Sequence, residues 1–343
     1  MKKKSKNKVF IIAEAGVNHN GDINKAIKLV DIAKKAGADA VKFQLFDINE
    51  QISPIAKNAK YQLNATGEKN MAKMAQDYFL PWEEHIKIKK YCTKVGIEYL
   101  SSCCDKKAVN FLVHKLKCNL IKISSGEITN HLLLKHIAKK NKKIILSTGM
   151  SDLKEIKKAV YLFKDKSKLS LLHCISNYPA KDEVQNLNII NLLKKKFNLP
   201  IGFSDHTKGN ISAIIAVTLG SQIIEKHFTI NKNLKGPDHS MSLNPKELRD
   251  YVNKIRQTEE ILGEKREEKI ISKEELIMRK IARRGIISIK DIEKGEKLTN
   301  KNIAIKRPMV GIDASKFEKV LNKTSKTKIK RNTPIYESMI INS

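Results

Sequence analysis

The chain has 343 residues and a formal net charge of +31, from 67 lysines and arginines against 36 aspartates and glutamates. Its hydrophobic content of 41% predicts a globular protein, and its length predicts one large domain and a small one. The longest uncharged run, residues 209–224, is too short and too polar for a membrane span, and the apolar run near the basic N-terminus is too short for a signal peptide. We therefore expect a cytoplasmic protein with no membrane partner.

The basic residues are mostly lysines, and this argues against a nucleic-acid partner. Only eight are arginines, none of them lies before Arg249, and the lysines are spread along the whole chain. Planar contacts to phosphates and bases favour arginine, so we expect no nucleic acid and instead a surface that attracts anionic substrates. The five cysteines form no CxxC pair, which excludes a zinc ribbon and suits a reducing cytosol.

Short apolar runs alternate with segments of helical periodicity along most of the chain. The expected strands are residues 9–15, 38–45, 97–102, 118–124, 143–148, 169–175, 200–206 and 222–228. The expected helices are residues 22–36, 81–95, 106–116, 130–140, 152–164, 186–197, 208–219 and 245–262. Eight strand–helix units over about 260 residues predict a (β/α)8 TIM barrel. A doubly wound open sheet is the alternative, but AEAGVNHNGD after the first strand is not the GxGxxG loop of that fold.

The pattern changes after the last of these helices. We expect the barrel domain over residues 1–263, a highly charged linker or connecting helix over 264–280, and a small, mainly β domain over 281–343. The last segment has short β-like runs separated by the turn sequences DIEKGE and LTNKN.

Polar residues fall repeatedly at the carboxyl ends of the expected barrel strands, where TIM barrels carry their active sites. In chain order these residues are Glu14, Lys42, Gln44, Lys122, Ser124, Ser125, Ser147, Asn177, Tyr178, His206, Glu225 and His227. One such residue alone is usually an ordinary edge group, whereas their recurrence on consecutive strands predicts a functional site.

His206 and His227 close the seventh and eighth strands, which are neighbours in a barrel. Two imidazoles with nearby oxygen atoms suit a divalent cation, with Asp205 and Glu225 as supporting partners. The alternative is two ordinary core histidines. Zinc is a weaker choice because no cysteine is suitably placed.

Lys42 and Lys122 are expected inside the barrel mouth, where a buried lysine needs an anionic partner. With Ser124, Ser125 and Ser147 they predict a cradle for phosphate and carboxylate groups. A Schiff-base lysine and an outward-pointing lysine are the alternatives. Glu14 is a candidate acid/base, a water acceptor or a lysine partner, and Cys103–Cys104 are read as small buried residues rather than a nucleophile.

The chain resembles the bacterial sialic acid synthases, which make N-acetylneuraminate, legionaminate and related nine-carbon acids. The resemblance covers nearly the whole chain through IIAEAGVNHNGD, AVKFQLF, IKISSGEITN, ILSTGM, LLHCISNYP, IGFSDHT, IEKHFT and GPDHSMSL. The segment with DIEKGEKLTNKNI and KRP is similar to the antifreeze-protein-like (SAF) domain of that family. The chain departs from the family at Ser102-Cys103-Cys104, where a Thr/Ser-Pro-Phe stretch is usual, and at Met309 and Val310, where glycine is usual.

The resemblance implies roles for single residues. Glu14, Lys42 and Lys122 match catalytic positions, and His206 and His227 match the ligands of Mn²⁺ or Mg²⁺. The positions that match substrate-binding residues are Gln44, Ser102, Ser125, Ser147, Tyr178, Asp238 and Arg307. Arg307 matches an arginine that one subunit places in the barrel of the other, which implies a domain-swapped homodimer.

The implied reaction condenses phosphoenolpyruvate with N-acetylmannosamine or 2,4-diacetamido-2,4,6-trideoxymannose, and water, to give N-acetylneuraminate or N,N'-diacetyllegionaminate and phosphate. A pseudaminic acid synthase and a synthase acting on phosphorylated aldoses are alternatives, and the absence of arginine from most of the barrel disfavours the second. The non-enzyme alternative is a module that binds carbohydrate or nucleic acid.

Overall fold

The structure, a computed structural model, describes residues 8–341. It divides into two compact units, the first ending at Glu264 and the second beginning at Lys265, and each is described by itself.

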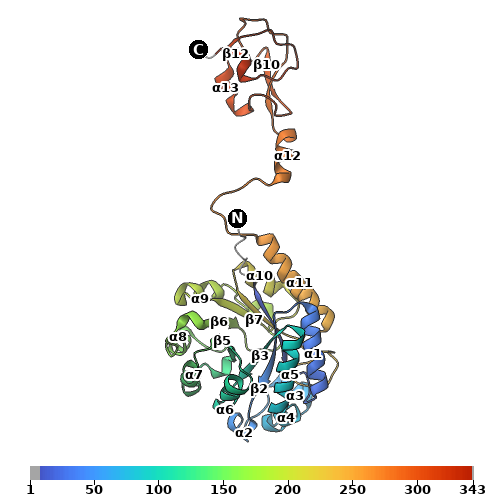
Figure 1. Cartoon of the computed structure of the whole chain (residues 1–343), viewed down its shortest axis with the longest axis vertical. Coiled ribbons are helices and arrows are strands. Elements are labelled where there is room, and N and C mark those ends of the chain that lie inside the picture. The colour runs from blue at the N-terminus through green and yellow to red at the C-terminus, as the bar shows by residue number, and fades with distance from the viewer. Residues whose placement is uncertain (1–7, 342–343) are drawn as a thin grey trace. The chain divides into compact units, whose positions relative to one another are not determined.

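The first unit is a closed barrel of eight parallel strands in the order β1 to β8, which confirms the predicted TIM barrel (Figure 1). The strands are β1 (Phe10–Gly16), β2 (Ala40–Leu45), β3 (Glu98–Cys103), β4 (Leu120–Ile123), β5 (Lys143–Ser147), β6 (Leu169–Cys174), β7 (Ile201–Asp205) and β8 (Ile223–His227). All eight fall within or beside the ranges expected from the sequence.

Helices surround the barrel and bury their apolar faces against its strands. They are α1 (Ile23–Ala36), α5 (Trp82–Val95), α6 (Lys106–Asn110), α7 (His131–Ala138), α8 (Leu153–Tyr161), α9 (Ile189–Phe197), α10 (Ile211–Thr218) and α11 (Pro245–Leu262). Helix α1 has the predicted ends, because the Asp22 side chain accepts from the amides of Asn24 and Lys25, and Gly37 adopts the left-handed conformation after the last turn. The expected helix 106–116 is α6 followed by a π-helical turn at Phe111–Lys115.

An insertion between β2 and α5, which was not predicted from the sequence, contains α2 (Ile48–Gln51), α3 (Lys60–Thr66) and α4 (Met71–Asp77). These helices have four, seven and seven residues, too few to show a clear helical repeat.

The barrel interior is built in layers, and this layering places the polar residues. One layer is apolar and consists of Ile12, Ala40, Leu100, Ile145, Leu172 and Ile223. Side chains alternate along a strand, so the residue two positions further on lies on the same interior face, one layer nearer the mouth. In five of these strands that residue is Glu14, Lys42, Ser102, Ser147 or Glu225, and all five are buried.

The second unit is the smaller one and has a hydrophobic core of its own, formed by Ile286, Ile292, Leu298, Ile303, Ile312, Val320, Ile329, Ile335 and Ile340. After helix α12 (Lys273–Ala282), strand β9 (Gly285–Ser288) pairs with β10 (Ile303–Lys306). After the short helix α13 (Phe317–Val320), strand β11 (Thr324–Ser325) pairs with β12 (Ile340–Ile341), and both pairs are antiparallel. Across residues 8–341, no helix combines the length and the apolar character needed to cross a membrane.

Candidate active site

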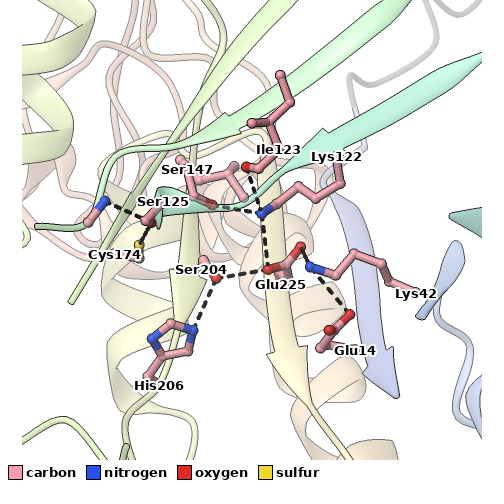
Figure 2. Close-up of polar contacts among 12 residues, drawn as sticks. Glu14, Lys42, Lys122, Ile123, Ser125, Ser147, Cys174, Ser204, His206 and Glu225 are labelled. Atoms are coloured by element: carbon pink, nitrogen blue, oxygen red, sulfur yellow. Dashed lines mark hydrogen bonds and ion pairs between the residues drawn. The ribbon is translucent and has the colours of Figure 1, made fainter. Parts of the chain in front are cut away.

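Two lysines and two glutamates of the polar layer at the barrel mouth point their side chains toward one another (Figure 2). Each successive contact in this group joins a lysine to a glutamate. Lys42 Nζ lies 3.3 Å from Glu14 Oε2 and 2.9 Å from Glu225 Oε2. Lys122 Nζ lies 3.6 Å from Glu225 Oε1 and donates to Ser147 Oγ at 2.8 Å. The structure therefore brings the predicted catalytic residues into one contiguous network.

The two carboxylates of this network have different protonation behaviour. Burial raises the pKa of Glu14 to about 8, against the opposing effect of Lys42. Burial also acts to raise the pKa of Glu225, but the charges of Lys122 and Lys42 outweigh it and place the pKa below the ordinary value. Glu14 therefore holds a proton near neutral pH while Glu225 stays ionised, a division that suits acid–base chemistry.

Small polar groups beside Lys122 form an anion cradle. Ser125 Oγ accepts from the Gly149 amide at 3.0 Å and lies 3.1 Å from Cys174 Sγ. A Cβ at Gly149 would stand 2.9 Å from Ser125 Oγ and 2.8 Å from Cys174 Sγ, so no larger residue fits there without displacement. Ser102 is in register with Lys122 on the neighbouring strand. Ser102, Ser125 and Ser147 thus offer hydroxyl groups that, together with Lys122, could meet an anion, whereas no side-chain hydrogen bond joins the predicted Ser124 to them among the described residues.

His206 and His227 lie side by side, with ring centroids 5.8 Å apart, and the Tyr178 ring packs 4.1 Å from that of His206. His206 Nδ1 donates to the Ile175 carbonyl at 2.7 Å, which leaves Nε2, in a long contact of 3.4 Å with Ser204 Oγ, as the ring nitrogen that could bind a cation. Burial lowers the pKa of both histidines, so both are neutral at pH 7, the form that binds metals. His227 Nδ1 is buried without a hydrogen-bond partner among the described residues.

This pair fits a divalent cation that keeps open coordination positions. The described residues contain no group of three or more His, Cys, Asp or Glu side chains placed to hold a metal, so a cation here would have only His206 and His227 as ligands of these four types. Water and substrate oxygens, the ligands that Mn²⁺ and Mg²⁺ prefer, would fill the coordination positions that the two histidines leave open.

The supporting partners of the histidines differ from those expected. Asp205 points away from the barrel interior, accepts from the Tyr251 hydroxyl of α11 at 2.8 Å and lies 3.0 Å from Lys226 Nζ. The expectation that Asp205 supports the histidines directly is wrong, because alternation turns it toward the helices. Glu225 reaches His206 only through Ser204, whose Oγ is 2.9 Å from Glu225 Oε1 and 3.4 Å from His206 Nε2.

Sequence reasoning left Ser204 out of the site. Ser204 could have been identified from the sequence as a site residue, because it lies one residue before Asp205 on β7 and on the same face of the strand as His206.

The residues predicted to bind the sugar meet around Gly16, beside Glu14. A Cβ at Gly16 would lie 3.3 Å from Asp238 Oδ2, 3.5 Å from Gln44 Nε2 and 3.5 Å from Glu14 Oε1. A cavity of about 200 Å³ opens here, and Gln44, Tyr178, His227 and Asp238 contribute to its wall. Burial raises the pKa of Asp238 to about 6.

Arg307 is an exposed residue of the second unit, directly after β10. Its role at the barrel of a partner subunit stays a prediction.

Comparisons with known proteins agree with this architecture. The NeuB family matches residues 29–267 and the SAF domain matches residues 283–341. The chain is 44% identical over 335 residues to the N,N'-diacetyllegionaminic acid synthase of Campylobacter jejuni, covering 96% of this chain and 99% of that protein. It is 40% identical to the Legionella pneumophila enzyme of the same name, covering 91% and 89%.

Among solved structures, the N-acetylneuraminic acid synthetase of Leptospira borgpetersenii has a TM-score of 0.71 and 36% identity, covering 79% of this chain and 90% of that one. The family models and the Campylobacter jejuni relative span both units. The chain belongs to the NeuB family, and its second unit is a SAF domain.

Proposed function

We propose that this protein is a nonulosonic (sialic) acid synthase, a transferase that condenses phosphoenolpyruvate with the aldehyde of an N-acetylated amino-sugar. The observation that carries the proposal is the buried Glu14–Lys42–Glu225–Lys122 layer between the histidine pair and the serine cradle. The names of the relatives from Campylobacter jejuni and Legionella pneumophila support the same class of product.

Phosphoenolpyruvate would lie over the lysines. Its phosphate and carboxylate groups need cations and hydroxyl donors, which Lys42, Lys122, Ser102, Ser125 and Ser147 supply in a buried setting. Glu225 stays ionised between the two lysines and keeps them charged and aligned before the substrate arrives.

The amino-sugar would lie on the other side of the histidines, against Gln44, Tyr178 and Asp238. A divalent cation, Mn²⁺ or Mg²⁺, held by His206 and His227, would supply Lewis-acid polarisation of the aldehyde oxygen. Holding both substrates at fixed positions removes much of the entropic barrier to their reaction.

The reaction forms one carbon–carbon bond and one carbon–oxygen bond to water, and it breaks the carbon–oxygen bond to phosphate. The methylene carbon of phosphoenolpyruvate attacks the aldehyde carbon, and the aldehyde oxygen takes up a proton and becomes a hydroxyl group. Water adds to the former enol carbon and loses one proton, and the resulting hydroxyl group gives its remaining proton to the departing phosphate, which leaves the ketone of the product. Glu14, protonated near neutral pH and beside the sugar-binding residues, is placed to donate the first proton and receive the second.

Phosphate release from phosphoenolpyruvate tests the proposal directly. We expect release when purified protein, Mn²⁺ and an N-acetylated mannosamine-type sugar are combined, and loss of release on chelation. His206→Ala and His227→Ala should lose metal-dependent turnover, as well as the rise in melting temperature that Mn²⁺ produces in the wild type. His114→Ala, at an exposed position, is the matched control. Full activity in both histidine variants would overturn the metal assignment, and no release with any amino-sugar would overturn the function.

A further inference from the structure

A buried ion pair lies behind the two histidines, on the side of the strands that faces away from the barrel interior. Asp205 and Lys226 are partners in the register of β7 and β8, and Lys226 Nζ lies 3.0 Å from Asp205 Oδ2. Their side chains are 0% and 2% exposed, so solvent screens the pair little. Asp205 directly precedes His206 in the chain. Lys226 directly precedes His227, so each member of the pair is joined to one histidine by a single peptide bond.

The pair also holds the chain on both sides of His206. The amide and the hydroxyl group of Thr207 donate to Asp205 Oδ1 at 2.8 and 2.7 Å, which closes an Asx-type turn around His206. Lys226 Nζ donates to the Thr207 carbonyl and so links β8 to the residue that follows His206. The backbone of this histidine is therefore fixed by the residue before it and by the residue after it.

A helix fixes the outer face of the same pair. The hydroxyl group of Tyr251, a buried residue of α11, donates to Asp205 Oδ2 at 2.8 Å. Lys226 Nζ lies 5.4 Å from the centre of the Tyr251 ring, within the range of a cation–π contact. Because the oxygens of Asp205 are engaged by α11, by β8 and by its own loop, this carboxylate links the positions of three segments.

Stability alone does not account for a buried pair of charges at this place. The cost of removing two charges from water offsets most of their attraction, and apolar residues often replace such pairs without loss of stability. A buried pair does supply direction, because each hydrogen bond to a carboxylate requires a particular orientation. Here the direction concerns the ends of β7 and β8, where the ring centroids of His206 and His227 lie 5.8 Å apart.

We infer that Lys226 and Asp205 are positioning residues, which set the separation and the orientation of His206 and His227 from outside the barrel. Groups that orient the ligands of a metal contribute to its affinity although they do not touch it. This role rests on the metal site of the proposed synthase function, because the cation concerned is the one that the two histidines would hold. Asp205 thus acts on the histidines through the backbone and not by a direct hydrogen bond.

Mn²⁺ binding in the absence of substrates tests this role. Lys226→Met keeps the apolar stem of the side chain and removes the charge that links β8 to Asp205 and to the Thr207 carbonyl. We expect its Kd for Mn²⁺, measured from the electron paramagnetic resonance signal of the free ion, to rise about tenfold or more. At saturating Mn²⁺, the KM for phosphoenolpyruvate should stay within about twofold of the wild-type value, because that substrate would bind in the barrel interior.

Arg256→Met is the matched control, because it breaks contacts of the same helix at the other end of the barrel. Arg256 of α11 donates to the Val9 carbonyl at 2.7 Å and to Asp39 Oδ2 at 2.6 Å, directly before β1 and β2. This end of a TIM barrel serves stability and not chemistry. The control should keep the wild-type Kd for Mn²⁺, even where its melting temperature falls as far as that of Lys226→Met.

A second variant keeps the test decisive if Lys226→Met fails to fold. Tyr251→Phe retains the ring and removes only the hydroxyl group that donates to Asp205. Its Kd for Mn²⁺ should rise about threefold, which corresponds to the loss of one hydrogen bond of ordinary strength.

The outcomes separate this role from the proposed function. A wild-type Kd for Mn²⁺ in folded Lys226→Met, or in Tyr251→Phe where the first variant does not fold, would overturn the role and leave the synthase function standing. An equal rise of the Kd in Arg256→Met would trace the effect to a general loss of stability and would overturn the role as well. Absence of phosphate release with every amino-sugar would overturn the function, whereas the Mn²⁺ measurements, which need no turnover, would still decide the role of Lys226.

Discussion

A single carboxylate, Glu225, organises the charges of the site. Its two oxygens lie 2.9 Å from Lys42 Nζ and 3.6 Å from Lys122 Nζ, and all three side chains are buried. Burial lowers the pKa of Lys122, so this lysine depends on Glu225 for its proton. A buried charge without its partner is strongly unfavourable, which makes the residue sensitive even to an isosteric change.

Replacing Glu225 with glutamine should weaken binding of phosphoenolpyruvate. Without the carboxylate, Lys122 loses charge and Lys42 loses a fixed partner, so we expect the KM for phosphoenolpyruvate to rise about tenfold or more. Steady-state phosphate release measures it. Glu293→Gln, in an exposed pair with Lys328, is the control. An unchanged KM in Glu225→Gln would contradict the role given to this residue.

At the scale of elements, helix α5 is joined to β3 through a buried histidine. His85 Nδ1 bonds the Tyr99 hydroxyl at 2.9 Å, and its ring packs against Phe43 of β2. Burial lowers the pKa of His85 to about 3, so the folded protein excludes the charged form that the unfolded chain accepts below about pH 6.5. The stability from neutral His85 is complete above pH 6.5 and is lost progressively as the pH falls toward 3.

This contact predicts a defined dependence of stability on pH. Between pH 7 and pH 5 the His85 contribution to the free energy of unfolding should fall by about 2 kcal/mol. Urea unfolding of wild type and His85→Gln at both values measures it, and the variant should show a smaller loss. His114→Gln, at an exposed position, should behave like wild type. If His85→Gln kept the full wild-type pH dependence, the assignment to this contact would be wrong.

At the scale of the whole molecule, the domain-swapped homodimer implied by the family resemblance would make the two units of one chain serve different barrels. The basis is the resemblance at Arg307, an exposed arginine in the second unit that would complete the barrel of the partner. A site shared between two subunits can be recognised without knowing the shape of the dimer. When two variants with different defects form a mixed dimer, both defects can fall in one barrel, which leaves the other barrel intact.

Mixing two inactive variants tests the sharing. Arg307→Ala and His227→Ala should each be inactive alone, but subunit exchange should restore about a quarter of wild-type activity. Half of the dimers become mixed, and each mixed dimer has one site with an intact His227 and an intact Arg307. Phosphate release after refolding the variants together measures the recovery. No recovery, despite exchange shown by a tagged subunit, would mean that the arginine acts in its own chain or not at all.

The sequence alone determined the barrel, its eight strands and the positions of most site residues. The reason is local: an apolar residue facing the interior and a polar residue two positions later, as in Ile12 and Glu14 or Ala40 and Lys42, can be read from one strand. The small domain was equally visible because its turn sequences are local signals.

Only the tertiary structure decided which of these residues meet. Glu225 pairs with the lysines and Asp205 turns to Lys226 and Tyr251, because partners depend on the register of neighbouring strands and the docking of α11. The insertion stayed hidden because its helices have at most seven residues and owe their position to packing on the barrel. Short helices acquire their place from long-range contacts, which no local pattern contains.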